Sequence, residues 1–143
     1  MTNNRKNNAN PVIGEVYMMK FDGSGSEQSG WRPGVVFQNN LGNKHSPNII
    51  ALPLTSAMKK TSQPTHVVVY ADDTGLHKNS LVLCENPECL SKEKMGRYIT
   101  KLSDEYMKQI AVASVLATGA LSFFSKLDVL EIWERSMKLN CVA

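Results

Sequence analysis

Short apolar runs separated by polar, glycine-bearing loops fill most of the chain up to residue 100. Runs rich in β-branched and aromatic residues predict strands over residues 12–21, 32–38, 48–54, 65–70, 80–84 and 96–100. The Gly/Ser-rich segment 22–30 and the Asn-rich segment 39–47 are typical of loops. The pattern therefore predicts a small sheet of short strands.

Helical periodicity replaces the strand pattern near the C-terminus. Ser103 is a good N-cap, and the acidic residues after it suit the positive end of a helix that runs towards Gly119. A second helical pattern covers about residues 121–139, and one apolar stripe follows it: Phe124, Leu127, Leu130, Trp133 and Met137. We expect this stripe to pack on the domain's own surface. The alternative is a helix that binds a partner.

These elements predict a mainly β fold with C-terminal helices (α+β), built as a small SH3-like, partly closed antiparallel barrel of five to seven strands. Residues 1–11 are polar and read as a flexible N-terminal arm. We expect residues 12–119 to form the barrel domain with its helix. Residues 120–143 would be a C-terminal helical extension.

Composition adds few constraints to this picture. The chain has 143 residues, a net charge of +3 and a sequence pI near 8.8. This mild basicity permits an anionic partner, but the dense basic runs typical of tail-driven nucleic-acid binding are missing. No apolar run is long enough to span a membrane, and residues 1–10 hold no hydrophobic signal segment. We therefore expect a cytoplasmic protein with no membrane contact.

Neither the cysteines nor the known short motifs predict a metal or a cofactor. Cys84, Cys89 and Cys141 are odd in number and lack CxxC spacing, which argues against a disulfide framework or a zinc site. Cys84 lies in an apolar run and is expected in the core. The chain also lacks a Gly-rich phosphate loop, HExxH, GxSxG and a dinucleotide fingerprint.

Arg32 is the most informative charged residue. It is the only charged side chain between Glu27 and Lys44, and it stands where a Gly/Pro-bearing turn enters a strand. Its planar guanidinium always carries charge and forms bidentate hydrogen bonds with phosphate oxygens, so Arg32 is well suited to bind an anion. The alternative is a surface arginine that shields a hydrophobic edge.

Polar groups at the predicted strand ends can cleave RNA without a metal, because the RNA's own 2′-hydroxyl is the nucleophile. Arg32 would stabilise the charge that builds on the phosphate oxygens, and Thr55 would hydrogen-bond the scissile phosphate. Arg32 is a poor general base at neutral pH. The other polar groups of this set are Glu27, Gln28, Asn39 and Ser56.

The histidines offer a more familiar acid–base route, but the sequence brings no two of them together. His66 begins a strand and is expected to be structural. His77 sits in a predicted turn. His45 is the histidine nearest the proposed site in sequence and is a candidate substrate contact.

An ordered series of short motifs resembles the MazF/PemK toxin family over about residues 12–119. The motifs are Gly14-Glu15-Val16, Gly25-Ser26-Glu27-Gln28-Ser29-Gly30-Trp31-Arg32-Pro33, Gln38-Asn39-Asn40-Leu41-Gly42-Asn43, Leu54-Thr55-Ser56, Pro64-Thr65-His66-Val67, Ser80-Leu81-Val82-Leu83 and Leu102-Ser103-Asp104. The resemblance implies a CcdB/MazF-like barrel and a homodimer. It implies a sequence-specific, metal-independent endoribonuclease that leaves a cyclic phosphate and a 5′-hydroxyl on single-stranded RNA. It also implies a cognate antitoxin whose acidic, disordered segment covers the RNA groove.

The resemblance also assigns residues. The family's catalytic arginine and threonine match Arg32 and Thr55, and positions near the RNA groove match Glu27, Gln28, Asn39 and Ser80. Many relatives carry an arginine where this chain has Glu88, which reverses a charge beside a polyanion. Two rivals stay open. The first is a CcdB-like toxin that acts on a protein target, and the presence of both Arg32 and Thr55 counts against it. The second is a repurposed RNA-binding module of the same fold, which Glu88 and the additional C-terminal helix favour.

Overall fold

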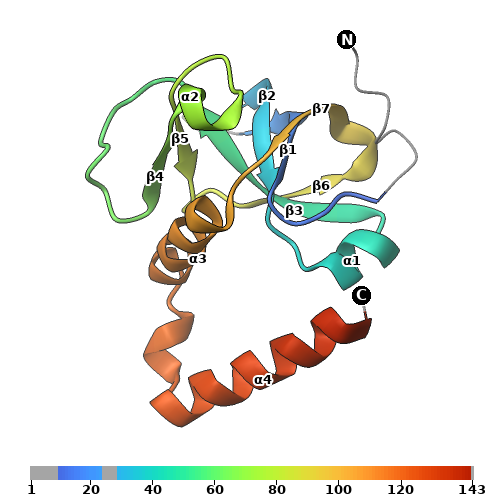
Figure 1. Cartoon of the computed structure of the whole chain (residues 1–143), viewed down its shortest axis with the longest axis vertical. Coiled ribbons are helices and arrows are strands. Elements are labelled where there is room, and N and C mark those ends of the chain that lie inside the picture. Colours follow the sequence, from blue (N-terminus) through green and yellow to red (C-terminus); the bar gives the residue numbers. More distant parts are fainter. Residues whose placement is uncertain (1–9, 24–28, 143) are drawn as a thin grey trace.

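The computed structural model describes residues 10–23 and 29–142, which form a bent antiparallel sheet with helices at its margins (Figure 1). The strands are β1 (Glu15–Asp22), β2 (Ser29–Val36), β3 (Asn48–Thr55), β4 (His66–Val69), β5 (Ser80–Leu83), β6 (Glu88–Ser91) and β7 (Met95–Lys101). The helices are α1 (Asn40–His45), α2 (Ala71–Thr74), α3 (Asp104–Ala117) and α4 (Lys126–Val142), with 3-10 turns η2 (Lys92–Lys94) and η3 (Ala120–Phe123).

The strands follow the order β4-β5-β3-β2-β1-β7, and β6 also pairs with β3. Every pair is antiparallel. The path ends at β4 and β7, which are not paired with each other in the described residues, so the sheet bends without closing. The predicted fold class, a mainly β, partly closed antiparallel barrel with C-terminal helices, is confirmed.

Both faces of the sheet are buried. One face packs against α3 and forms the first hydrophobic cluster, and the sheet curls so that its other face encloses a second cluster. Neighbours in β1 and β2 divide between the clusters, as the two-residue period of a strand requires. Val16 and Val35 join the cluster that includes Ile110 and Ala113 of α3. Their neighbours Tyr17 and Val36 join the second cluster, with Met19, Phe21, Ile49, Ala51 and Leu90.

Pro33 marks the place in β2 where the neighbouring strands change. Pro33 lies opposite Met18 of β1, whereas β3 pairs with β2 only from Gly34 onward. A strand with one open edge tolerates proline, because no partner there needs the missing N–H. A Cβ on Gly34 would lie 2.7 Å from Phe21 Cζ, so glycine permits the close packing beside this edge. The open edge leaves Arg32 and Pro33 beside a pocket.

Three elements, α1, α2 and β6, stand in segments that were expected to be loops or turns. In α1, the Asn39 side chain caps the helix by accepting from the Gly42 N–H at 2.8 Å, and the buried Asn43 amide donates to the Gln38 carbonyl at 2.8 Å. Hydrogen bonds of amide side chains stabilise this helix, and its sequence has no apolar periodicity. Strand β6 was missed because it has four residues, of which Leu90 is the buried one.

The two C-terminal helices behave differently. Ser103 caps α3 by accepting from the Tyr106 N–H, as predicted, and α3 buries Ile110 and Ala113. All residues of α4 whose side chains are described are exposed. The expectation that the apolar stripe packs on the domain's own surface is therefore wrong: α4 swings away from the sheet and approaches α1 at its far end (Figure 1).

Candidate active-site pocket

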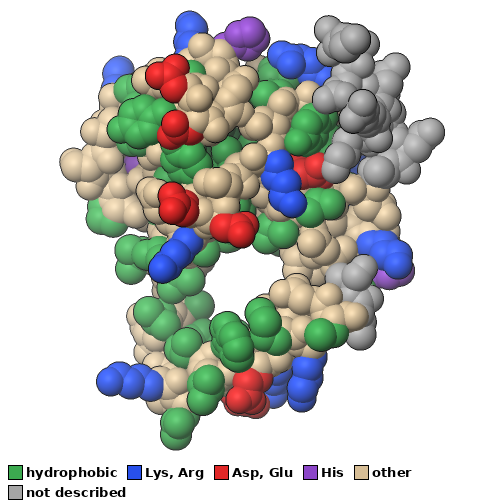
Figure 2. All heavy atoms as spheres, in the orientation of Figure 1, with side chains coloured by type: hydrophobic (Ala, Val, Ile, Leu, Met, Phe, Trp, Pro, Cys, Tyr) green, Lys and Arg blue, Asp and Glu red, His purple; other side chains and the backbone are tan. Residues whose placement is uncertain are grey.

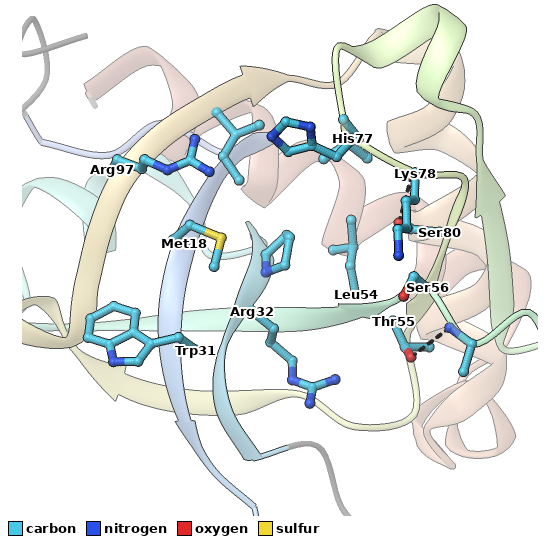
Figure 3. Close-up of a pocket in the computed structure, with 14 residues that line it drawn as sticks. Met18, Trp31, Arg32, Leu54, Thr55, Ser56, His77, Lys78, Ser80 and Arg97 are labelled. Carbon is cyan, nitrogen blue, oxygen red and sulfur yellow. Dashed lines mark hydrogen bonds between the residues drawn. The ribbon is translucent and has the colours of Figure 1, made fainter. Parts of the chain in front are cut away.

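A pocket of about 410 Å³ opens where β3 leaves β2 and turns to pair with β5. Strands β1, β2 and β7 form one wall, and the end of β3, the loop before β5 and the start of β5 form the other. Figure 3 shows Arg32 reaching from β2 between Trp31 on one side and Thr55 on the other. The bend of the sheet thus brings together side chains that are up to 81 positions apart in sequence, from Met18 to Ile99.

The pocket is lined by cations. Arg32, Lys78 and Arg97 belong to its wall together with His77, and no Asp or Glu is among the lining residues that the structure describes. Like charges converging on one concave surface raise the local concentration of anions. An arginine also presents a rigid fork of donors that fits phosphate oxygens. The charge of the pocket therefore favours a polyanionic ligand.

Arg32 and Thr55 face this pocket from neighbouring strands. Arg32 is half-buried at the open edge of β2. Thr55 ends β3, where Thr55 Oγ1 accepts a hydrogen bond from the Ala57 N–H at 3.1 Å. A hydroxyl can accept and donate at the same time, so this bond orients the side chain and leaves the O–H able to donate to a ligand.

The two serines predicted for the site lie beside Thr55 but differ in exposure. Ser56 is exposed and follows Thr55 directly. Ser80 is only 6% exposed, and Ser80 Oγ donates to the Lys78 carbonyl at 3.0 Å. That bond holds the loop from which Lys78 and His77 reach the pocket. Ser80 therefore positions a cationic loop as well as lining the wall.

An aromatic and aliphatic surface lies at the β7 side of the pocket. Trp31 is 57% exposed, and Met18 lies between Trp31 and Arg97 in Figure 3. A Cβ on Gly96 would lie 3.2 Å from Trp31 Cζ3, so glycine in β7 gives the indole its place. An exposed indole beside cations is a suitable platform for a planar base.

The remaining predicted site residues are not among the described residues that line the pocket. Asn39 caps α1 and His45 ends it, so both lie beyond the C-terminal end of β2, whereas Arg32 lies within the strand. Glu27 and Gln28 fall outside the described residues. Glu88 lies in β6 opposite Ala51 and does not line the pocket.

His66 is structural, as predicted. His66 Nε2 lies 2.7 Å from Glu85 Oε1, and His66 Nδ1 lies 3.0 Å from the Lys60 carbonyl oxygen. The sequence-based reasoning missed His77 and Arg97 as pocket residues. Arg97 reaches the site because β7 pairs with β1, a contact between distant segments that no local pattern announces.

The prediction that Cys84 lies in the core is confirmed. All three are free thiols; Cys84 is buried, and burial raises its pKa to about 11, whereas Cys89 and Cys141 are exposed. In the described part of the chain, no three His, Cys, Asp or Glu side chains cluster as metal ligands would. None of the described helices is both long and apolar enough to cross a membrane.

Comparisons with known proteins point to one family. Residues 13–116 match the family described as "PemK-like, MazF-like toxin of type II toxin-antitoxin system". The chain is 37% identical over 107 residues to Endoribonuclease MazF of Staphylococcus saprophyticus. The aligned region covers 74% of this chain and 89% of that relative.

Solved structures agree with this match. An endoribonuclease in complex with its cognate antitoxin, from a mycobacterial species, aligns with a TM-score of 0.65 and 26% identity, over 80% of this chain and 98% of that one. MazF from Deinococcus radiodurans aligns with a TM-score of 0.65 over 76% of this chain and 98% of that one, at 21% identity, and so shows a shared fold.

Proposed function

The chain belongs to the PemK-like, MazF-like toxin family of type II toxin–antitoxin systems, and from that premise we propose that it is an endoribonuclease. We propose that it cleaves single-stranded RNA at a specific sequence, without a metal, and leaves 2′,3′-cyclic phosphate and 5′-hydroxyl ends. The observation that carries this proposal is the convergence of Arg32 and Thr55 on one cationic pocket. The toxin would act in the cytoplasm, where messenger RNA is present.

The proposed chemistry needs no nucleophile from the protein. The 2′-hydroxyl of the RNA loses its proton to solvent as its oxygen attacks the adjacent phosphorus, the bond to the 5′-oxygen breaks, and a cyclic phosphate forms. Arg32 stabilises the negative charge that grows on the phosphate oxygens, and the Thr55 O–H donates to the same phosphate. Arg32 is also the proposed proton donor to the departing 5′-oxygen.

Substrate binding divides between the two walls of the pocket. We propose that Lys78 and Arg97 neutralise neighbouring phosphates and that Trp31 stacks on a base, because single-stranded RNA is read by stacking and by contacts to base edges. Ser56 and Ser80 support the phosphate side. The roles of Glu27, Gln28, Asn39 and His45 stay predictions, and Asn39 and His45 could reach this RNA only at a distance from Arg32.

We also propose a homodimer and a cognate antitoxin with an acidic, disordered segment. The mycobacterial relative was solved in complex with its cognate antitoxin, which supports the second partner. A cationic pocket with no carboxylate among its described lining residues suits an acidic segment as well as RNA. The antitoxin would therefore compete with RNA for the same surface. We propose residues 12–119 as the catalytic domain and residues 120–143 as an extension.

The test is to incubate the purified protein with a long mixed-sequence RNA in EDTA and to map the cut ends. We expect cuts at one recurring sequence, with 5′-hydroxyl ends, that disappear in Arg32→Ala. Arg135→Ala is the matched control, because Arg135 is an exposed arginine on α4. Absence of cutting by the folded wild-type protein in EDTA contradicts the proposal. Toxicity that survives Arg32→Ala would instead support a CcdB-like protein target.

A further inference from the structure

His66 and Glu85 form a contact outside the pocket of Arg32, on the side of the domain where Figure 2 shows acidic side chains. His66 Nε2 lies 2.7 Å from Glu85 Oε1, and the two side chains are 8% and 30% exposed. His66 Nδ1 lies 3.0 Å from the Lys60 carbonyl oxygen. Both ring nitrogens of this nearly buried imidazole therefore have oxygen partners.

The partners of the His66 ring determine how many protons it carries. A carbonyl oxygen can only accept a hydrogen bond, so Nδ1 carries a hydrogen. A carboxylate oxygen can also only accept, so Nε2 needs a hydrogen as well. A proton shared by the two side chains resides on the imidazole, because imidazole is ordinarily a stronger base than a carboxylate. The contacts of His66 thus favour an imidazolium beside an ionised Glu85.

The surroundings of the pair favour the same charge. Glu85 Oε2 is buried with no hydrogen-bond partner among the described residues, so the positive charge that compensates this carboxylate comes from His66. Asp73 of α2 and Glu105 of α3 line a cavity of about 720 Å³ together with His66, and no Lys or Arg is among its described lining residues. The side chain of Lys60 is exposed. The other titratable side chains of this cavity are Tyr70 and Tyr106.

The Lys60 carbonyl connects this pair to the end of β3. The same carbonyl accepts from the Gln63 N–H at 3.1 Å, and Lys60 has a φ of 56°, in the left-handed region. A residue other than glycine adopts this conformation at a cost, so its neighbours must hold the turn. Next along the chain, the Lys59 N–H donates to the Ala57 carbonyl at 2.9 Å, and the Ala57 N–H donates to Thr55 Oγ1 at 3.1 Å.

We propose that the His66–Glu85 pair positions Thr55 for RNA cleavage by holding the turn at Lys60, and that it does so only while His66 is protonated. The inference rests on the proposed function, because it concerns the hydroxyl that would bind the phosphate. When the imidazolium loses a proton, Nδ1 keeps its hydrogen for Lys60, and Nε2 then presents a lone pair to the carboxylate. Two acceptors repel each other, so the ring moves and the turn is released. The effect of the pair is therefore present where His66 is charged and Glu85 ionised, and it is lost as the pH rises through the titration of His66.

Two substitutions of Glu85 separate the charge from the contact. A glutamine amide can donate to a neutral Nε2, so Glu85→Gln keeps the ring in place without the extra proton. Glu85→Ala removes the contact. We would measure kcat on a single-stranded RNA over about pH 5–9, which spans the ordinary range of histidine titration. Dividing each rate by that of Glu85→Gln removes the pH dependence of the 2′-hydroxyl itself.

We expect the wild type and Glu85→Gln to cleave equally at low pH, and the wild type to become about tenfold slower at high pH, because a small displacement of a catalytic group lowers the rate steeply. Glu85→Ala should be about tenfold slower than Glu85→Gln at every pH. Glu131→Ala removes an exposed carboxylate from α4 and is the matched control, which should follow the wild type. A ratio of wild type to Glu85→Gln that does not change with pH overturns the proposal.

A double-mutant cycle tests whether the pair acts through Thr55. In a Thr55→Val background, Glu85→Ala should cost almost nothing further, because the hydroxyl that the pair positions is missing. In an Arg97→Gln background, the same substitution should keep its full effect. If the effects of Thr55→Val and Glu85→Ala multiply in full, Glu85 supports the fold as a whole, and the proposal is overturned.

Nitrogen NMR of the His66 ring tests its protonation state without any RNA. At neutral pH we expect hydrogens on both ring nitrogens in the wild type, and on Nδ1 alone in Glu85→Gln. A neutral His66 ring in the wild type at neutral pH overturns the proposal. Failure of the proposed function would look different: the wild type would cut no RNA, while the His66 signals would still be those of a charged ring.

Discussion

The pocket and α4 belong to one chain, but they differ in what surrounds them. The pocket is formed by strands whose apolar side chains are buried: Leu54, which lines it, is 1% exposed. On α4, by contrast, Leu127 is 78% exposed. The pocket collects basic side chains from three segments, and α4 balances acidic and basic side chains along one helix. The pocket lies within the family match of residues 13–116, and α4 lies outside it.

The difference separates two tasks. A pocket built from distant strands can hold Arg32 and Thr55 in fixed relation, because the sheet around it is packed on both faces. Helix α4 leaves its apolar side chains exposed, so it does not hold catalytic residues in place within its own domain. Cleavage and association should therefore respond to different mutations.

The largest effect is expected from Arg32→Ala. Removing a preorganised donor from a developing oxyanion typically costs about 10²- to 10³-fold in rate. We expect a loss of kcat of that order against a short single-stranded RNA. Arg32→Lys should recover little, since an ammonium group lacks the two-to-two geometry. Arg135→Lys on α4 is the control and should change nothing. A rate for Arg32→Ala within a few-fold of the wild type would move the chemistry away from this residue.

Thr55→Val should have the next largest effect. The substitution keeps the shape of the side chain and removes the O–H that is proposed to donate to the phosphate. A hydrogen bond to a charged group contributes about 1.5–3 kcal/mol, so kcat should fall roughly 10- to 100-fold. Thr55→Ser should keep most of the activity, because it retains the hydroxyl. Equal rates for the valine and serine variants would assign Thr55 to structure alone.

A smaller effect is expected for Arg97, which is proposed to contact a neighbouring phosphate. Arg97→Gln should weaken RNA binding at low salt. It should also reduce the slope of log affinity against log salt by about 0.7, the value for one phosphate of a single strand. Arg135→Gln removes the same charge from α4 and should leave the slope as it is. If both variants lower the slope equally, net charge governs binding, and the pocket does not hold the phosphate.

Much of the barrel could be predicted from sequence, because its strands carry local signals. The valines at 67–69 and the apolar run at 80–83 specify β4 and β5 by composition alone. Helix α1 could not be predicted, since it is held by the amides of Asn39 and Asn43 and has no apolar period.

The site divides in the same way. Thr55 stands out because it ends β3 beside Ser56, and Arg32 because Gly and Pro lie near it, although the structure places it inside β2. Arg97 and Trp31 do not, because their meeting depends on β7 and β2 flanking β1. The α4 stripe was recognised from its period, but period cannot say whether an apolar face is covered by its own domain or by another chain.

The smallest effect, and the sharpest contrast, is expected from Leu127→Ala at low protein concentration. Leu54→Ala in the core should lower the free energy of unfolding by about 2–5 kcal/mol. Leu127→Ala should change the free energy of unfolding by no more than about 0.5 kcal/mol, as an exposed substitution does.

Denaturant unfolding should be followed over a range of protein concentrations, because a contact between copies stabilises by mass action and a contact within the domain does not. A cost of Leu127→Ala that grows with concentration places the apolar side of α4 between two chains. A large cost at every concentration would mean that α4 packs on its own barrel, as the stripe alone had suggested.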